Sequence, residues 1–225
     1  MKVIDSAYTK LAQELYTLRQ KSDSKAMADC RAKILRTAFK QTSAPRTPIL
    51  VSGISKCNYG DYPGARKLSA TLAWTPSKDS LQVKADVTDA FFKPGADSGS
   101  QVDLFISPSG TRWDTSQITI TPSGTQGKAK VSLASSEYGP SDPANPENVA
   151  KAKTVSARWK KTRGGYSLDV KIPWRAVRGY QAGWNMLPVD AVVTGGGSDN
   201  ECKIKMGALG DPVADTFTYV GLKAK

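Results

Sequence analysis

A short polar stretch combines residue types that could hold a sugar or a similar ligand. Trp113 stands between Arg112 and Asp114 in a segment that separates two predicted strands. Because the neighbouring residues are polar, the pattern does not require the indole to be buried. An exposed indole can stack on a flat ligand face while the adjacent charges bind its polar groups, so these three residues are candidate ligand contacts. Three more aromatic residues are lesser candidates, with core packing as the alternative for each: Tyr138, Phe217 and Tyr219.

A second candidate site is the densest basic segment of the chain. Its members are Lys151, Lys153, Arg158, Lys160, Lys161 and Arg163. On a strand, Arg158 and Lys160 share one face. If Gly164 and Gly165 turn the chain into a hairpin, the next strand adds Lys171 nearby, and Asp169 offsets part of the charge. Such a stripe could bind sulfated or uronate chains in a salt-sensitive way, and an ordinary solvated face is the alternative.

Three aspartates suggest one metal site, and the absence of histidine excludes the commonest kinds of catalytic site. Asp86, Asp89 and Asp97 could supply oxygen ligands to a structural calcium ion, although surface carboxylates without an ion are the alternative. The chain contains no histidine, which removes histidine-based acid–base catalysis, the usual nucleophile–histidine sites and most zinc sites. We therefore expect a protein that is not an enzyme, with calcium as the one cofactor to consider.

The net charge points to polyanionic partners. The 225 residues include 32 Lys and Arg against 20 Asp and Glu, a net charge of +12. About half of this excess lies in the first fifth of the chain. Acidic polysaccharide, nucleic acid and membrane surfaces all attract such a protein. Nucleic acid is the less favoured partner, because neither a known binding motif nor interleaved exposed aromatic residues accompany the charge.

Three cysteines allow one disulfide. Cys30, Cys57 and Cys202 do not have the spacing of a metal site. Cys57 and Cys202 flank the predicted strands from either end, so they could be bridged with Cys30 left free, or all three could be unrelated thiols. No apolar run is long enough to span a membrane, and residues 1–20 lack the order of a signal peptide. If the protein is exported, this chain is a mature form or part of a longer protein.

The elements that would position these residues change character near residue 49. In residues 1–40 apolar residues recur at a spacing of three to four, which predicts two amphipathic helices. Their apolar stripes need a surface: each other in a hairpin, the rest of the chain, a partner protein or a second copy. Residues 41–48 have the composition of a linker. Residues 49–225 form a separate β-domain in this interpretation.

Alternation with a period of two dominates the β-domain. It is clearest at Tyr166–Pro173, where Pro173 must end the strand or place it at an edge. The longest loop is expected at Ser135–Lys151, and no helix is expected between the strands. This is typical of a mainly β fold, an antiparallel β-sandwich of jelly-roll type with an N-terminal helical hairpin or extension. The predicted strands are Ile49–Val51, Leu68–Trp74, Leu81–Thr88, Gln101–Ser107, Ser116–Thr121, Lys128–Ala134, Thr154–Lys161, Tyr166–Pro173, Trp184–Val193, Glu201–Met206 and Thr216–Leu222.

Four segments, in order and spacing, resemble the family 9 carbohydrate-binding modules. These are Leu81–Asp89 (LQVKADVTD), Gln101–Ile106 (QVDLFI), Gly165–Trp174 (GYSLDVKIPW) and Gly183–Asp190 (GWNMLPVD). The resemblance covers roughly residues 68–222 and implies the same sandwich. It also implies non-catalytic sugar binding between two tryptophans, but the loop before Gln101 and the stretch before the last strand contain none. Asp103 retains an acidic group at a sugar-contacting position, whereas Thr119 and Leu187 replace the family's arginine and glutamine.

Two hypotheses follow from these observations. In the first, the β-domain binds a glycan, which could be an acidic polysaccharide, for an extracellular or cell-surface bacterial protein. In the second, the sandwich is the scaffold of an assembly protein whose N-terminal helices dock a partner or drive self-association.

Overall fold

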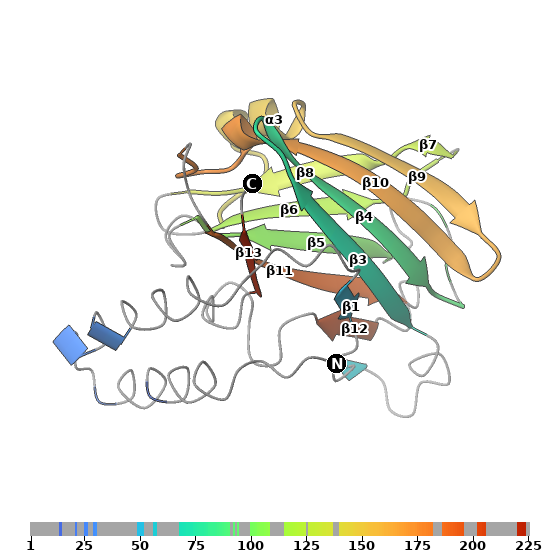
Figure 1. Cartoon of the computed structure of the whole chain (residues 1–225). Helices are drawn as coiled ribbons and strands as arrows, with labels where there is room; N and C mark the ends of the chain where they lie inside the picture. The colour runs from blue at the N-terminus through green and yellow to red at the C-terminus, as the bar shows by residue number, and fades with distance from the viewer. Residues whose placement is uncertain are drawn as a thin grey trace.

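The computed structural model describes the sandwich core and parts of the flanking chain. The described residues are 14, 21, 25–26, 29–30, 49–51, 56–57, 68–90, 92, 94, 100–108, 115–124, 126–136, 140–181, 186–195, 202–205 and 220–223. They form two antiparallel sheets packed face to face, so the predicted β-sandwich is confirmed (Figure 1).

The first sheet has six strands in the order β1-β3-β4-β10-β9-β7. Its two central strands are β4 and β10, and β10 forms a hairpin with β9 in which Trp159 pairs with Leu168 across the ladder. On its other side β10 pairs with β4 along its whole length. The strands are β1 (Ile49–Val51), β3 (Ser69–Pro76), β4 (Ser80–Thr88), β7 (Gly127–Lys128), β9 (Ser156–Thr162) and β10 (Gly165–Pro173).

The second sheet has seven strands in the order β2-β12-β11-β5-β6-β8, and β13 also pairs with β11. Both β12 and β13 lie along β11, at its two ends, while β5 lies along its other side. The strands are β2 (Lys56–Cys57), β5 (Gln101–Ile106), β6 (Ser116–Thr121), β8 (Lys130–Ala134), β11 (Met186–Gly195), β12 (Cys202–Lys205) and β13 (Val220–Lys223).

The core lies between the two sheets, and β10 illustrates how the alternation builds it. Tyr166, Leu168, Val170 and Ile172 are buried, whereas Asp169 and Lys171 on the opposite face are exposed. Each buried aliphatic side chain of this kind contributes about 1.5–3 kcal/mol to folding. The strand ends at Pro173, as predicted, because proline cannot donate a ladder hydrogen bond.

Gly165 is required by the close approach of β10 and β4. A Cβ atom at this position would lie 2.1 Å from the Val87 carbonyl oxygen and 2.9 Å from the Asp89 nitrogen. The Asp89 N–H donates to the Gly164 carbonyl at 2.8 Å, which fixes the start of β10 against the end of β4. Only a residue without a side chain fits between these backbones.

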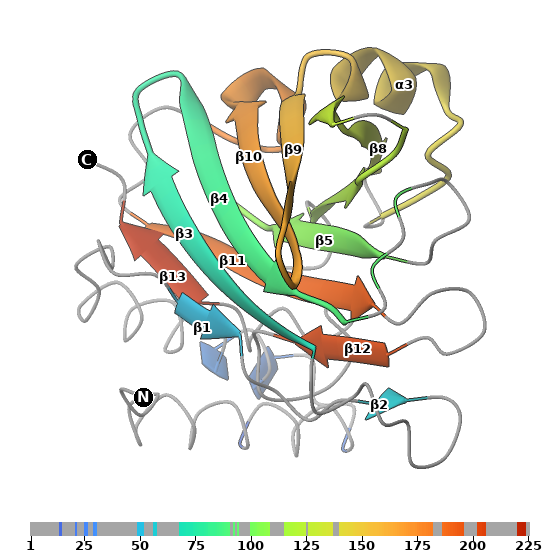
Figure 2. The same cartoon turned by 90° about the vertical axis from the view of Figure 1, so that its right-hand side faces the viewer.

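The structure corrects the prediction that no helix lies between the strands. The helix α3 (Pro146–Ala152) replaces the last third of the predicted loop Ser135–Lys151, and the 3-10 helix η3 (Trp174–Ala176) follows β10. Asn145 caps α3 by accepting a hydrogen bond from the Glu147 N–H, and Pro146 fits the first turn because it lacks a backbone N–H. Figure 2 shows α3 at one end of the sandwich.

The predicted strand Lys128–Ala134 is two strands that belong to different sheets. β7 pairs with β9 in the first sheet, whereas β8 pairs with β6 in the second. Between them lies Ala129, which is buried and donates its N–H to the Ala157 carbonyl at 2.9 Å. The chain therefore crosses from one sheet to the other at Ala129, which a run of alternating residues cannot reveal.

Most of residues 1–48 lie outside the described part of the chain, so the predicted helical hairpin and linker stay predictions. Of this region, Glu14, Lys25, Ala26, Asp29 and Cys30 are described as helical. Among the described helices, none is long and apolar enough to cross a membrane.

Candidate functional site

The described residues include four of the ten predicted ligand contacts: Asp103, Arg158, Lys160 and Lys171. The others lie outside the described residues, namely Arg112, Trp113, Asp114, Tyr138, Phe217 and Tyr219. The tryptophan platform therefore stays a prediction, and the site is built from the basic residues.

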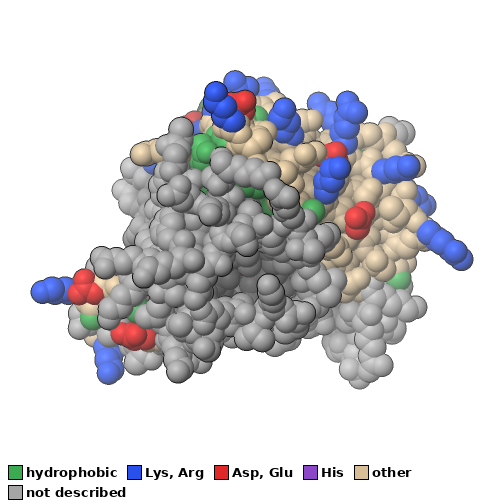
Figure 3. Space-filling model, viewed as in Figure 1, with side chains coloured by type: hydrophobic (Ala, Val, Ile, Leu, Met, Phe, Trp, Pro, Cys, Tyr) green, Lys and Arg blue, Asp and Glu red, His purple; other side chains and the backbone are tan. Residues whose placement is uncertain are grey.

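Arg158 and Lys160 lie exposed on the outer face of the first sheet, as their alternation predicts. The ladder places Arg158 between Asp169 of β10 and Lys128 of β7. Asp169 accepts a hydrogen bond from the Gln82 amide at 3.1 Å. Lys171 is opposite Ser156, one row along the same face. Figure 3 shows many Lys and Arg side chains and few acidic ones on the described surface in this view.

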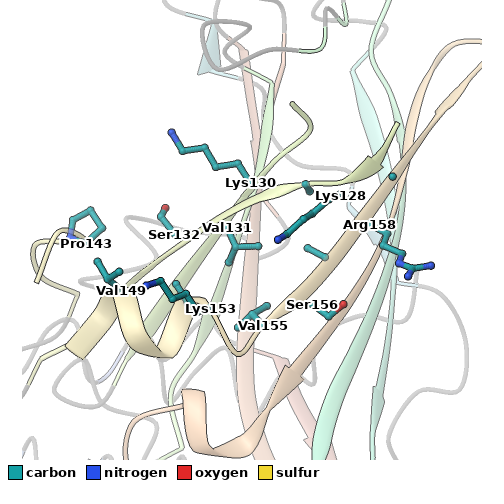
Figure 4. Close-up of a pocket in the computed structure, with 14 residues that line it drawn as sticks. Lys128, Lys130, Val131, Ser132, Pro143, Val149, Lys153, Val155, Ser156 and Arg158 are labelled. Carbon is teal, nitrogen blue, oxygen red and sulfur yellow. The ribbon is translucent and has the colours of Figure 1, made fainter. Parts of the chain in front are cut away.

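A hollow of about 850 Å³ lies beside Arg158, at the edge where the two sheets separate. One wall is the crossing strand segment, with Lys128, Lys130 and Val131, and the other is the end of α3 and the start of β9 (Figure 4). Lys128 reaches over the hollow, whereas Lys130 and Arg158 point outward on either side of it. We call this hollow the basic groove, and its described lining is residues 127–132, 143, 149, 152, 153 and 155–158.

The basic groove is positively charged without internal compensation. Lys128, Lys130, Lys153 and Arg158 line it, and the described lining includes no acidic residue. None of these four cations forms an ion pair with another described residue. The nearby acid of α3, Glu147, is engaged by Lys151 at 2.7 Å, and this hydrogen-bonded cation lowers the pKa of the Glu147 carboxyl.

The floor of the groove is apolar. Val131 and Ala152 pack against the main core, and Val155 belongs to it. Val149 of α3 is 38% exposed and is the one large hydrophobic side chain that lies open to solvent in the described part of the chain. This combination of cations and aliphatic surface suits an anionic ligand that also has apolar faces.

Buried polar contacts hold the helical wall of the groove. Asn148 is 1% exposed and donates to the Asp142 carbonyl at 2.9 Å, and its amide oxygen lies 3.3 Å from the Ser135 hydroxyl. After the helix, the Thr154 hydroxyl donates to the Lys151 carbonyl at 2.8 Å. These bonds fix α3 against the end of β8 and set the position of Lys153 relative to β9.

Asp103, the acidic residue at the position that the resemblance associates with sugar contact, has internal partners. It is 5% exposed and accepts hydrogen bonds from Gln101 at 2.9 Å, Gln117 at 3.2 Å and Thr119 at 2.5 Å. Leu187 is 2% exposed in the core between the sheets, so it offers no ligand contact.

Of the three carboxylates considered for calcium, the structure describes Asp86 and Asp89, so the complete set stays a prediction. Asp86 is exposed on the outer face of β4, whereas Asp89 follows the strand, is 4% exposed and accepts from the Ser100 hydroxyl at 2.9 Å. Asp97 lies outside the described residues. Within the described part of the chain no three potential ligands form a metal-binding group.

Three tryptophans are core residues, as the alternation predicts: Trp74, Trp159 and Trp174. The Trp159 indole donates to the Ser123 carbonyl at 3.3 Å, and the Trp174 indole donates to the Ser77 carbonyl at 2.9 Å. Trp174 also stacks on Tyr180 with 4.2 Å between ring centroids. Because all three are buried, none offers the open face that sugar stacking requires.

Sequence reasoning missed Lys128 and Lys130 as candidate ligand contacts. The available signal was the Lys-Ala-Lys pattern at residues 128–130, in which one cation stands on each side of an alanine that is buried. Joining them to Arg158 requires knowing that β7 pairs with β9, and no local pattern contains this information.

The comparisons with known proteins match this chain to solved structures, whereas no protein-family model and no curated protein matches the sequence. A family 9 carbohydrate-binding module from Caldicellulosiruptor kristjanssonii in complex with cellotriose aligns with a TM-score of 0.56 at 12% identity, covering 80% of this chain and 82% of that one. Its glucose complex gives 0.51 at 13% identity, with 82% and 84% covered.

A third solved structure is a protein of Bacteroides uniformis ATCC 8492 that is described provisionally as carbohydrate-binding. It aligns with a TM-score of 0.56 at 14% identity, covering 86% of this chain and 92% of that one. At these identities the likeness establishes the fold. The sandwich is that of the family 9 carbohydrate-binding modules, as the four sequence segments imply.

Proposed function

We propose that this protein is a non-catalytic glycan-binding domain that takes an acidic polysaccharide in the basic groove. The observation that carries the proposal is the cluster of Lys128, Lys130, Lys153 and Arg158 around an aliphatic floor, with no acidic residue in the described lining. The fold supports it, because structures with the same sandwich include modules bound to cellotriose and glucose.

Acidic rather than neutral sugar is the favoured ligand class. Neutral sugars are usually held by exposed aromatic faces, and the described tryptophans are buried. Asp103 has its acceptor positions directed to Gln101, Gln117 and Thr119, so it is occupied without a ligand. The groove instead offers cations, which bind carboxylate or sulfate groups in a salt-dependent way.

The absence of histidine from the sequence supports a binding role rather than catalysis. The described lining of the groove also lacks a carboxylate or a thiol that could act as acid, base or nucleophile. In this proposal the domain acts outside the cell or at the bacterial surface, where it positions a larger protein on a polysaccharide.

Affinity gel electrophoresis tests the proposal. The protein should be retarded by polygalacturonate, alginate or heparin in about 50 mM salt, and the retardation should largely disappear near 500 mM salt because the charges are then screened. Neutral xylan and hydroxyethyl cellulose should retard it much less. Absence of retardation in every one of these gels at low salt would contradict glycan binding.

A matched pair of variants separates the groove from the overall charge. Lys128→Glu with Arg158→Glu changes the net charge from +12 to about +8, and so does Lys78→Glu with Arg175→Glu, at two exposed residues outside the groove lining. The groove pair should lose most of the retardation, about tenfold in apparent affinity, while the control pair should stay within about twofold. Equal losses in both pairs would mean that bulk charge alone causes retention.

Asp103→Asn distinguishes the groove from the position used by the resembling family. We expect this change to leave retardation by acidic polysaccharide intact, since Asp103 is buried away from the groove lining. Selective loss of retention in this variant, with folding retained, would place the ligand on the other sheet.

A further inference from the structure

We propose that Cys57 and Cys202 are joined by a disulfide bond that fastens β2 to the seven-stranded sheet. The strand register places these two residues directly opposite each other in the antiparallel ladder of β2 and β12. They are far apart in the sequence, so no local sequence pattern predicts that their strands pair. The proposal is independent of glycan binding.

The general geometry of antiparallel ladders suits a bridge at this position. Directly opposite residues have Cα atoms about 5.5 Å apart in a hydrogen-bonded pair and about 4.5 Å apart in a non-hydrogen-bonded pair. Disulfides span Cα separations of about 4.4–6.8 Å, so either kind of pair lies in range. Directly opposite residues also share a face of the sheet, which is the second requirement for a bridge.

The other described pair between β2 and β12 does not explain what holds these two strands together. β2 is 2 residues long, and the other register pair among its described residues is Lys56 opposite Lys203. Two lysines directly across a ladder repel each other and destabilise the pairing. A strand of this length, with one of its two pairs composed of like charges, needs another source of attachment, and a covalent bond supplies it.

The chemistry is ordinary thiol–disulfide exchange. The Cys57 thiolate attacks a small-molecule disulfide such as oxidised glutathione and forms a mixed disulfide, which releases one thiol. The Cys202 thiolate then attacks the Cys57 sulfur and releases the second thiol. The two cysteines lose two electrons and two protons in total, and the small disulfide is reduced to two thiols.

Cys30 is the thiol left over and serves as an internal reference. It is 1% exposed and takes no part in the proposed bridge, which closes a loop that contains nearly all of the sandwich, from β2 to β12. Bridges that close long loops restrict the unfolded chain most in the chain-entropy description. A bridge of this kind persists in an oxidising compartment, which fits a protein that functions outside the cytoplasm.

Peptide mapping of the full chain tests the bridge directly. The protein is incubated with oxidised glutathione, unfolded, alkylated without reductant and digested with trypsin. The expected product is peptide 57–66 linked to peptide 179–203, with a single alkylated cysteine at Cys30. Alkylation of all three cysteines would overturn the proposal, and so would a bridge that joins Cys57 or Cys202 to Cys30 or to a second copy of the chain.

Thermal unfolding provides the second measurement. Reduction of the wild-type protein should lower its Tm by roughly 5–15 °C, because a long loop is released. The Cys57→Ser variant should have the lower Tm already and should not respond to reductant, whereas Cys30→Ala should still respond. A wild-type Tm that does not change when mass spectrometry confirms reduction of a bridge would mean that the bridge does not fasten the fold.

Discussion

Tyr166 places a phenol group inside an apolar core. Its side chain is fully buried, its ring contacts Phe92 at 4.6 Å between centroids, and its hydroxyl has no hydrogen-bond partner among the described residues. Burial, together with the carboxylates of Asp89 and Asp103, raises the pKa of this hydroxyl far above its usual value. The folded state therefore disfavours ionisation of this hydroxyl relative to the unfolded chain.

The raised pKa of Tyr166 should make the folded protein less stable at alkaline pH. In the unfolded chain the tyrosine ionises near pH 10, but in the folded protein it stays protonated, so above about pH 10 the folded state binds one more proton. The free energy of unfolding should therefore fall by up to about 1.4 kcal/mol per pH unit from this group, and Tyr166→Phe should lack that part of the loss.

Urea unfolding of the two proteins between pH 8 and pH 11 measures the difference. At pH 8 the phenylalanine variant should be as stable as the wild type or about 1 kcal/mol more stable, since a buried unpaired hydroxyl is removed. Parallel pH profiles for the two proteins would show that Tyr166 ionises in the folded state.

At the scale of elements, the pairing of β4 with β10 depends on one glycine. The backbones at Gly165 and Val87 approach so closely that no side chain fits between them. The adjacent Gly164 has open surroundings, because a Cβ atom there would meet the Thr88 Cγ2 atom at 3.8 Å, an ordinary contact. Two neighbouring glycines thus have different roles in the same turn.

Alanine substitutions should separate these roles. Gly165→Ala should lower the free energy of unfolding by about 3 kcal/mol or more, because a backbone must move to admit the methyl group. Gly164→Ala should change it by no more than about 1 kcal/mol in either direction. Chemical denaturation of both variants measures this, and similar values for the two would contradict the close approach at Gly165.

Local patterns predicted the hairpin of β9 and β10 because all of its information is local: alternation on both strands and Gly164-Gly165 between them. The same reasoning missed α3, since a helix of 7 residues is too short for a periodic stripe and only Asn145 and Pro146 mark its start. It found Arg158 but not the basic groove, because the groove joins residues from β7, β8, α3 and β9. Strand order depends on contacts between distant segments of the chain, so local sequence patterns could not predict it or the groove that it creates.

At the scale of the whole molecule, the basic groove lies where both sheets contribute a wall. Lys128 belongs to the first sheet and Lys130 to the second, with the crossing residue Ala129 between them. A polysaccharide held by both cations would therefore contact both layers of the sandwich. Binding should stabilise the connection between the two sheets at this edge, so its effect should appear in both sheets.

Hydrogen exchange measured by mass spectrometry can detect this effect. Saturation with a uronate oligosaccharide should slow exchange in residues 127–134 and in residues 153–158, by several fold where local opening is suppressed. The variant with Lys128→Glu and Arg158→Glu should show no such protection. Protection confined to the second sheet around β5 and β6 would indicate a ligand on the face that carries Asp103.

The two sides of the sandwich have a common arrangement. At one side β1 and β2, consecutive in the sequence, join different sheets, and at the other side β7 and β8 do the same. These four described edge strands are 3, 2, 2 and 5 residues long. Long, flat edges invite other chains to add a strand, which leads to fibres and aggregates. Brief edges offer little template for such growth, so copies of the domain at high local concentration have little strand edge through which to pair.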